Sequence, residues 1–293
     1  MLQAAMAETA TAIDQELEKV LPEKEDRRGK LIKSLRYSAI GGGKRLRPFL
    51  AMQSARLFSV PQTQALCVAT AIELVHCYSL VHDDLPAMDD DDQRRGKPTN
   101  HKIFGDALAI LAGDGLLTMA FELLNRPDTG IQPEIRSELT FELAKSAGIC
   151  GMIGGQAIDI QAQHQPMALS NIEYLQALKT GALIGFAVDA GPILASASKR
   201  HRVALARYAN ALGLAYQIID DLLDTEGEET DVGKQLRKDN NAGKATLVNA
   251  LGVERAKDKA REMTEEAVLS LKGFGPEAQL LREVATFLFS RTH

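Results

Sequence analysis

Apolar residues recur along most of the chain at intervals of three and four, the spacing that places them on one face of a helix. Near the N-terminus, for example, Ala10, Ile13, Leu17 and Val20 follow this pattern. Alternating β-branched stretches between tight turns are hard to find, so strands are difficult to place. Proline, glycine and polar clusters interrupt the periodic stretches at Pro22, 41–43, Pro61, Pro98, 125–133, 163–166 and 196–199. None of these breaks is long enough for a flexible linker, and the pattern predicts a single all-α domain over residues 1–293.

Composition narrows the class of protein. A chain of 293 residues with 45% hydrophobic content can bury a large core. The net charge of -5 and the absence of tryptophan argue against a nucleic-acid binder. Three cysteines (Cys67, Cys77 and Cys150) lack metal-ligand spacing, which favours reduced thiols in a cytoplasmic protein. We expect no targeting signal and no membrane span, since Asp114 interrupts the best candidate, 107–124.

An apolar helical stretch, 71–81, leads into an acidic segment at 83–92. Two carboxylates about 4 Å apart repel by roughly 4 kcal/mol at a surface-like dielectric, so a bound cation would relieve the cluster. Mg²⁺ prefers carboxylate oxygens and completes its coordination with water and substrate phosphate. Arg94 and Arg95 follow directly, and arginine binds phosphate through two parallel hydrogen bonds. The segment therefore predicts a site for a magnesium-bound polyphosphate.

A solvated acidic surface and a calcium-binding loop are two other interpretations of this segment. Acidic stretches are usually solvated surfaces, although here the apolar helix delivers the acids from the interior and Pro86 ends that helix. A calcium loop of the EF-hand type fails, because counting from Asp89 puts Arg94 at position six and Asn100 at position twelve.

A second acidic cluster lies in the apolar stretch 214–224. Gln217, Asp220, Asp221 and Asp224 share one face of the predicted helix. An acidic stripe facing solvent is the alternative. Two such clusters on two apolar helices could face each other across a bundle and hold several magnesium ions around one diphosphate.

Basic residues complete the candidate site. A glycine run at 41–43 precedes Lys44, Arg45 and Arg47, and glycine lets backbone amides approach a phosphate closely. A basic surface turn would give the same pattern. Single lysines elsewhere are usually solvated, and His76, two turns before Asp83 on the same helix, is by default a core histidine.

With 42–48, 83–96 and Gly233-Lys234 after the second cluster in order, the chain resembles the trans-isoprenyl diphosphate synthases, more narrowly the bacterial-type farnesyl diphosphate synthases. The resemblance implies an all-α isoprenoid-synthase helical bundle around a deep central cavity, usually as a homodimer. It further implies elongation of an allylic diphosphate with isopentenyl diphosphate by ionisation, condensation and elimination, with Mg²⁺ as cofactor.

The resemblance also implies roles for individual residues. Magnesium and the allylic diphosphate would be held by Asp83, Asp84, Asp89, Asp220, Asp221 and Asp224. The allylic diphosphate would also contact Arg94, Lys179, Lys234 and Lys244. Isopentenyl diphosphate would bind to Lys44, Arg47, His76 and Arg95. The developing carbocation would be lined by Thr180 and Gln217, with Lys179 beside them, and a further inward-facing motif supplies Gln156 and Asp159.

Product length is predicted from Tyr78 and the neighbouring Ser79. On one helix Tyr78 lies about 7 Å above Asp83, where a growing tail would meet its ring. In the family an aromatic there, with two extra residues between Asp84 and Asp89, is typical of a farnesyl product; simple core packing of Tyr78 is the alternative. Arg237 stands where relatives usually carry glycine, so the loop after Lys234 departs from the family pattern.

Three competing functions are weighed against this one. A geranyl or geranylgeranyl diphosphate synthase would differ only in product length. A terpene cyclase would need one diphosphate site and would leave Lys44, Arg47 and Arg95 without a role. A non-catalytic partner subunit typically loses one aspartate cluster, and this chain has both.

Overall fold

The computed structural model describes residues 1–23, 25–162, 167–226 and 246–290. Almost all regular structure in these ranges is helical, and the expectation of an all-α fold is confirmed. In chain order the α-helices are α1 (Leu2–Val20), α2 (Gly29–Ala39), α3 (Leu46–Arg56), α4 (Gln62–Asp83), α5 (Asn100–Phe104), α6 (Asp106–Asn125), α7 (Pro133–Ala147), α8 (Met152–Ala162), α9 (Leu169–Gln176), α10 (Ala182–Leu194), α11 (Lys199–Glu226), α14 (Leu247–Leu251), α15 (Val253–Ser270) and α16 (Gln279–Phe289). The shorter elements are the strands β1 (Gln93–Arg94) and β2 (Lys97–Pro98), the 3-10 turns η1 (Pro127–Thr129) and η3 (Pro276–Ala278), and the π-helical turn η2 (Ala177–Gly181).

The core forms around α4 and α10. Both helices are apolar on nearly every side, which is typical of helices surrounded by other helices, and most of their residues are buried. Helix α4 packs against α3, α6 and α10, and α10 also packs against α7 and α11. The buried apolar residues continue from α1 to α16.

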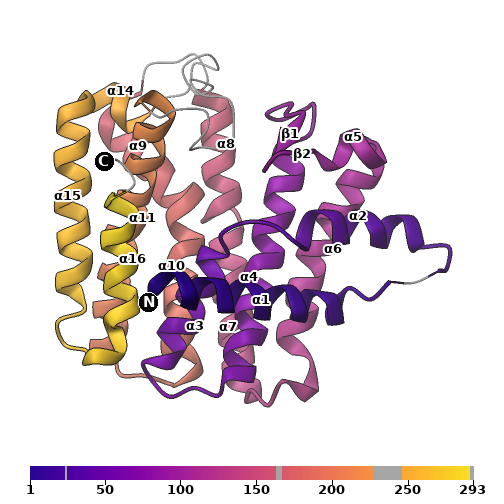
Figure 1. Ribbon diagram of the computed structural model, residues 1–293, viewed down its shortest axis with the longest axis horizontal. Helices are drawn as coiled ribbons and strands as arrows, with labels where there is room; N and C mark the ends of the chain where they lie inside the picture. The colour runs from indigo at the N-terminus through magenta and orange to yellow at the C-terminus, as the bar shows by residue number, and fades with distance from the viewer. Residues whose placement is uncertain (24, 163–166, 227–245, 291–293) are drawn as a thin grey trace.

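Figure 1 shows how the helices of the bundle are arranged. Helices α4 and α15 stand upright, while α1 and α2 run across the bundle. The hairpin β1–β2 lies beside α5 at the upper end of the view, and α14 lies at the same end. The C-terminal ends of α4 and α11 therefore approach the same end of the bundle, since β1 follows α4 and α14 contacts α11.

The structure contains one short hairpin in the described ranges, although strands were difficult to place from the sequence pattern. Strands β1 and β2 pair antiparallel, with Arg94 opposite Lys97, and the loop between them is Arg95-Gly96. Both loop residues have positive φ, 54° and 72°, which is the requirement of a type I′ turn. Such a short hairpin has no hydrophobic pattern of its own, and pattern analysis therefore missed it.

The expectation that no apolar stretch reaches the length of a membrane span is wrong. Three helical segments of the described chain are long and apolar enough by length and composition: Gln62–Asp83, Asp106–Asn125 and Leu169–Leu194. One acidic residue, Asp114, does not lower the hydropathy of α6 below that level. The fold buries 72% of the apolar window of α4 but only 39% of that of α6.

Candidate active site

The first aspartate cluster sits where α4 ends. Asp83 is the last helical residue and Asp84 caps the helix. The chain then folds back, with the Asp89 amide donating to the Asp83 carbonyl at 2.9 Å and the Asp91 amide donating to the Asp84 carbonyl at 3.2 Å. This return of the chain brings the predicted ligands Asp83, Asp84 and Asp89 to one end of α4.

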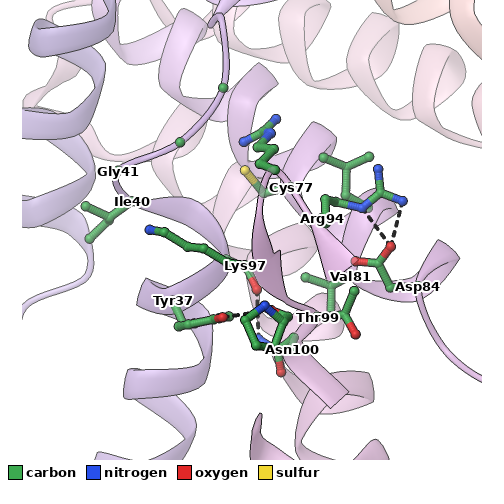
Figure 2. A pocket seen from close by; sticks show the side chains of 16 residues that line it. Tyr37, Ile40, Gly41, Cys77, Val81, Asp84, Arg94, Lys97, Thr99 and Asn100 are labelled. Carbon is green, nitrogen blue, oxygen red and sulfur yellow. Dashed lines mark hydrogen bonds and ion pairs between the residues drawn. The ribbon is translucent and has the colours of Figure 1, made fainter. Parts of the chain in front are cut away.

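Arg94 neutralises the buried member of this cluster. Its Nε donates to Asp84 Oδ1 at 2.6 Å, and its NH2 lies 2.6 Å from the same oxygen (Figure 2). Burial raises the pKa of the Asp84 carboxyl, and the Arg94 guanidinium opposes that shift. The predicted diphosphate ligand Arg94 therefore serves as a counter-ion to a predicted metal ligand in this structure.

The carboxyl of Asp83 has a raised pKa. Burial raises its pKa to about 6, Lys179 lowers it and Asp89 raises it. The Lys179 ammonium itself donates to Asp159 Oδ2 at 2.5 Å. Lys179 thus lies between the first aspartate cluster and Asp159 of α8.

Lys179 and Thr180 belong to the π-helical turn η2, an irregularity that is often found at functional sites. Thr180 Oγ1 donates to Gln217 Oε1 at 3.1 Å. One residue of η2 therefore faces the first aspartate cluster and the next contacts the second. The close approach of α8 depends on Gly155, where an added Cβ would lie 2.3 Å from the Lys179 backbone nitrogen.

The second aspartate cluster is built into the packing of α11. Asp221 and Asp224 are buried, at 3% and 4% exposure, which excludes a solvated acidic stripe for these two residues. Asp221 Oδ1 accepts from Gln217 Nε2 at 2.9 Å, and Oδ2 accepts from the Leu247 amide at 2.9 Å. Asp221 therefore links α11 to the start of α14, a role that the sequence did not indicate.

The predicted magnesium ligands fit a site completed by substrate. Among the described residues, the six predicted aspartates contain no set of three whose ligand atoms lie within 4.8 Å of one another. Mg²⁺ commonly uses one or two carboxylates together with substrate phosphates, so it does not require such a set. Carboxylate oxygens are the ligand type that Mg²⁺ prefers.

The four predicted isopentenyl diphosphate ligands come together. Lys44, Arg47, His76 and Arg95 line one cavity of about 390 Å³. Arg47 NH1 lies 3.4 Å from His76 Nε2, and burial together with Arg47 and Arg95 lowers the pKa of His76, which keeps the ring neutral. Gly43 has a φ of +90°, and an added Cβ would lie 2.5 Å from the Arg95 guanidinium. The glycine run thus makes room for an arginine.

Arg45 does not join these cations. It is buried with a φ of 46°, and its guanidinium binds Glu73 at 2.5 Å, Asp14 at 2.6 Å and the Ala39 carbonyl at 2.6 Å. Arg45, the middle cation of the basic segment after the glycines, is therefore a structural residue, in agreement with its absence from the predicted diphosphate ligands. This arginine fastens the turn between Lys44 and Arg47 to α1, α2 and α4.

A second cavity of about 270 Å³ lies between the glycine run and the hairpin (Figure 2). Tyr37 Oη donates to the Pro98 carbonyl at 2.7 Å, and Asn100 Nδ2 donates to Ser38 Oγ at 2.7 Å. Arg95 lines this cavity as well as the 390 Å³ cavity. Tyr37 and Asn100 therefore hold the hairpin that carries both arginines, and sequence analysis missed them because they act across the fold.

Tyr78 is buried above the first aspartate cluster, at 5% exposure. Its ring meets the His82 ring edge to face at 5.7 Å, and its hydroxyl has no hydrogen-bond partner within the described chain. The His82 ring lies against Gly113 of α6, where an added Cβ would come within 2.1 Å of its Nε2. The neighbouring Ser79 donates to the His76 carbonyl at 2.8 Å. His82 and Gly113 are thus unpredicted supports of the predicted length-determining residue.

Two predicted ligands, Lys234 and Lys244, lie outside the described residues, as does Arg237. Their predicted roles stay predictions. Gln156 of α8 has a buried Oε1 with no hydrogen-bond partner in the described ranges. It lies one helical turn before Asp159, the residue that pairs with Lys179.

Comparison with known proteins gives consistent relatives over nearly the whole chain. The family described as polyprenyl synthetase matches residues 29–280. A farnesyl diphosphate synthase of Geobacillus stearothermophilus is 44% identical over 90% of this chain and 89% of its own. A geranylgeranyl diphosphate synthase of Cyanophora paradoxa is 41% identical over 89% of this chain and 87% of its own. Among solved structures, an FPP/GFPP synthase from Zymomonas mobilis superimposes with a TM-score of 0.90 at 44% identity, covering 98% of each chain.

Proposed function

Because the chain belongs to the polyprenyl synthetase family and is a prenyltransferase, we propose that it makes farnesyl diphosphate. The substrates would be isopentenyl diphosphate with dimethylallyl and then geranyl diphosphate. The single observation that carries the proposal is the arrangement of η2, whose Lys179 lowers the pKa of Asp83 in the first aspartate cluster while Thr180 binds Gln217 beside the second. Relatives of similar identity carry farnesyl and geranylgeranyl names, so product length rests on Tyr78.

Each group has a chemical task in this proposal. Lys44, Arg47 and Arg95, with neutral His76, bind the diphosphate of isopentenyl diphosphate in the 390 Å³ cavity. Lys179 and Arg94 stabilise the negative charge that develops as the allylic diphosphate leaves, a preorganised electrostatic contribution. Magnesium held by Asp83, Asp84, Asp89, Asp220, Asp221 and Asp224 would supply further charge neutralisation to that diphosphate.

The carbocation and the proton are handled without a protein nucleophile. Thr180 Oγ1 and Gln217 Oε1, which lie 3.1 Å apart, are neutral oxygens that would stabilise positive charge without trapping it. The double bond of isopentenyl diphosphate attacks the allylic cation, and the departing diphosphate accepts the proton that is lost. Exclusion of water protects the cation from hydrolysis.

Product analysis tests the reaction and its length together. The protein would be incubated with dimethylallyl and isopentenyl diphosphates and Mg²⁺, and the dephosphorylated products sized by mass spectrometry. A dominant fifteen-carbon alcohol supports the proposal. A longer or shorter alcohol keeps the reaction and replaces the product with geranylgeranyl or geranyl diphosphate. No condensation by folded protein, with geranyl diphosphate also tried, would favour a non-catalytic subunit.

Tyr78→Ala tests the length-determining role. Loss of the ring removes the barrier above Asp83, and we expect longer products. Tyr78→Phe is the matched control, because it keeps the ring and removes only a buried hydroxyl that has no partner in the described chain. Equal product distributions for wild type and Tyr78→Ala would assign Tyr78 to core packing alone.

We also propose a homodimer that covers the exposed face of α6. This helix is mostly apolar, yet only 39% of its apolar window is buried. Ile110 and Leu111 are about half exposed, as is Ile103 on α5, and Phe141 on α7 is more exposed still. Light scattering should give twice the monomer mass, and Leu111→Asp should shift it toward the monomer.

Two further parts of the proposal are a cytoplasmic location, supported by three free thiols, and a single domain over residues 1–293.

A further inference from the structure

One group of side chains near the first aspartate cluster has no part in the proposed reaction. The ligand atoms of Asp90, Asp92 and His101 all lie within 4.8 Å of one another. Asp90 and Asp92 belong to the loop between α4 and β1, and His101 belongs to the first turn of α5. None of the three is among the residues that the family resemblance assigned to metal or substrate.

The hydrogen bonds around His101 fix the state of its ring. Thr99 Oγ1 donates its single proton to the Asp91 carbonyl at 2.6 Å. The contact of 3.2 Å between Thr99 Oγ1 and His101 Nδ1 therefore has Nδ1–H as the donor. In the neutral ring, this tautomer leaves Nε2 with a free lone pair, which is the form that binds metals.

That lone pair is buried and unused. His101 is only 5% exposed, and its Nε2 has no hydrogen-bond partner among the described residues. A buried polar atom without a partner costs about 1–3 kcal/mol, so it calls for a ligand. One ring nitrogen of His101 lies within 4.8 Å of a carboxylate oxygen of both Asp90 and Asp92, and these two carboxylates are exposed to solvent.

The carboxylates can turn toward an ion without disturbing the core. Asp90 and Asp92 are both exposed. Asp92 Oδ1 pairs with Lys102 at 2.7 Å, an exposed ion pair of the kind that contributes little to stability. An ion can therefore displace Lys102 or bind Asp92 alongside it.

We propose that Asp90, Asp92 and His101 form a second metal site, which takes a first-row transition ion such as Zn²⁺. One imidazole nitrogen with two carboxylates suits Zn²⁺, Co²⁺ or Mn²⁺, whereas Mg²⁺ prefers oxygen ligands alone. The bound ion joins the loop after the first aspartate cluster to α5. Its three residues differ from the six aspartates of the proposed magnesium site, and the proposal stands whether or not the proposed reaction is correct.

Cobalt provides a direct test, because bound Co²⁺ absorbs visible light according to its ligands. The full-length protein would be titrated with Co²⁺ in a large excess of Mg²⁺, which competes with Co²⁺ for sites made of carboxylates alone. We expect one Co²⁺ per chain with an absorption band typical of mixed nitrogen and oxygen ligands, and displacement of that band by Zn²⁺. No band under these conditions would overturn the proposal.

Variants identify the ligands. Asp90→Asn and Asp92→Asn should each weaken Co²⁺ binding by at least the roughly 10- to 100-fold seen for loss of a supporting ligand contact. Asp90 has a φ of 49°, and asparagine adopts that conformation as readily as aspartate, so Asp90→Asn keeps the loop intact. Asp106→Asn, an exposed acid at the start of α6, is the matched control and should bind Co²⁺ like wild type.

His101→Gln completes the set by removing the nitrogen ligand. The visible absorption band of bound Co²⁺ should disappear in this variant, while circular dichroism reports whether the protein still folds with glutamine at the buried position. If His101→Gln does not fold, the two exposed aspartate variants carry the test. Binding that is unchanged in both aspartate variants, or weakened equally in Asp106→Asn, would overturn the assignment.

Discussion

The two aspartate clusters contain the same residue type, but a buried aspartate in each accepts hydrogen bonds from a different kind of donor. In the first, Asp84 pairs with the Arg94 guanidinium at 2.6 Å, and Asp83 faces the Lys179 ammonium. In the second, Asp221 accepts hydrogen bonds from two neutral donors, the Gln217 amide and the Leu247 backbone. The first cluster ends a helix, whereas the second lies within one.

This difference indicates that the first cluster serves mainly the reaction, whereas the second also holds the fold together. An ion pair at a helix end can be exchanged for a substrate or a cation when its loop moves. A carboxylate that accepts a backbone hydrogen bond between two helices is part of the fold. The first cluster should therefore respond to substitution mainly in activity, and buried members of the second should respond in stability as well.

The largest expected effect is the loss of turnover in Asp83→Asn and Asp220→Asn. Each change removes a charge near the proposed magnesium and diphosphate site, and we expect turnover to fall roughly 100- to 1,000-fold, as for other preorganised electrostatic groups. Steady-state assays with geranyl and isopentenyl diphosphates at saturating Mg²⁺ would measure it. Asp128→Asn, an exposed acid in η1, is the control. Turnover within tenfold of wild type would remove that cluster from the chemistry.

The next effect compares neighbours on α11. Asp221→Ala leaves the buried Leu247 amide and the Gln217 side chain without their acceptor, and we expect the free energy of unfolding to fall by about 1–3 kcal/mol. Asp220→Ala, one residue earlier and partly exposed, should change it much less. Urea unfolding followed by circular dichroism would measure both. Equal losses would mean that Asp221 has no special role between α11 and α14.

Arg94→Lys tests whether the first cluster needs the two-nitrogen contact of a guanidinium or only a positive charge. Two nitrogens of Arg94 contact one Asp84 oxygen, and lysine cannot reproduce that fork. We expect KM for the allylic diphosphate to rise about tenfold, which corresponds to about 1.4 kcal/mol, with a smaller change in kcat. Arg126→Lys, in a surface pair with Glu122, is the control. An unchanged KM would show that positive charge alone is sufficient.

Some of this site follows from sequence because its cause is local. The apolar stretch before Asp83 has to form a buried helix, and Pro86 has to end it, so the position of the first cluster was predictable. The helical face of Gln217, Asp220, Asp221 and Asp224 was predictable for the same reason. Burial of that face was not, because it depends on α14, which starts more than twenty residues later.

Other parts depend on contacts that no local pattern contains. The turn η2 gains its π geometry inside an otherwise ordinary helical stretch. Arg45 looks like its basic neighbours, and only Asp14, Glu73 and the Ala39 carbonyl draw it inward. Similarly, Gly113 has meaning only because His82 of α4 packs against it. Each of these features arises from tertiary packing.

The smallest effect is a pH dependence that belongs to the first cluster. The pKa of Asp83 is about 6 in the folded protein, against 3.8 for an unperturbed aspartate. Between these values the folded state binds more protons than the unfolded state, so metal-free protein gains stability as pH falls from about 7 toward 4 and loses it as pH rises through 6. Because Asp83 is partly exposed and Lys179 is near, we expect only about 1 kcal/mol of the full shift to appear. Asp83→Asn removes the titrating group, and in chelator it should exceed wild type by that amount at pH 8 and match it near pH 4. Asp128→Asn should follow wild type throughout. Parallel curves for wild type and Asp83→Asn would mean that neighbouring charges already compensate Asp83, and the contrast between the two clusters would then rest on Asp84 and Arg94 alone.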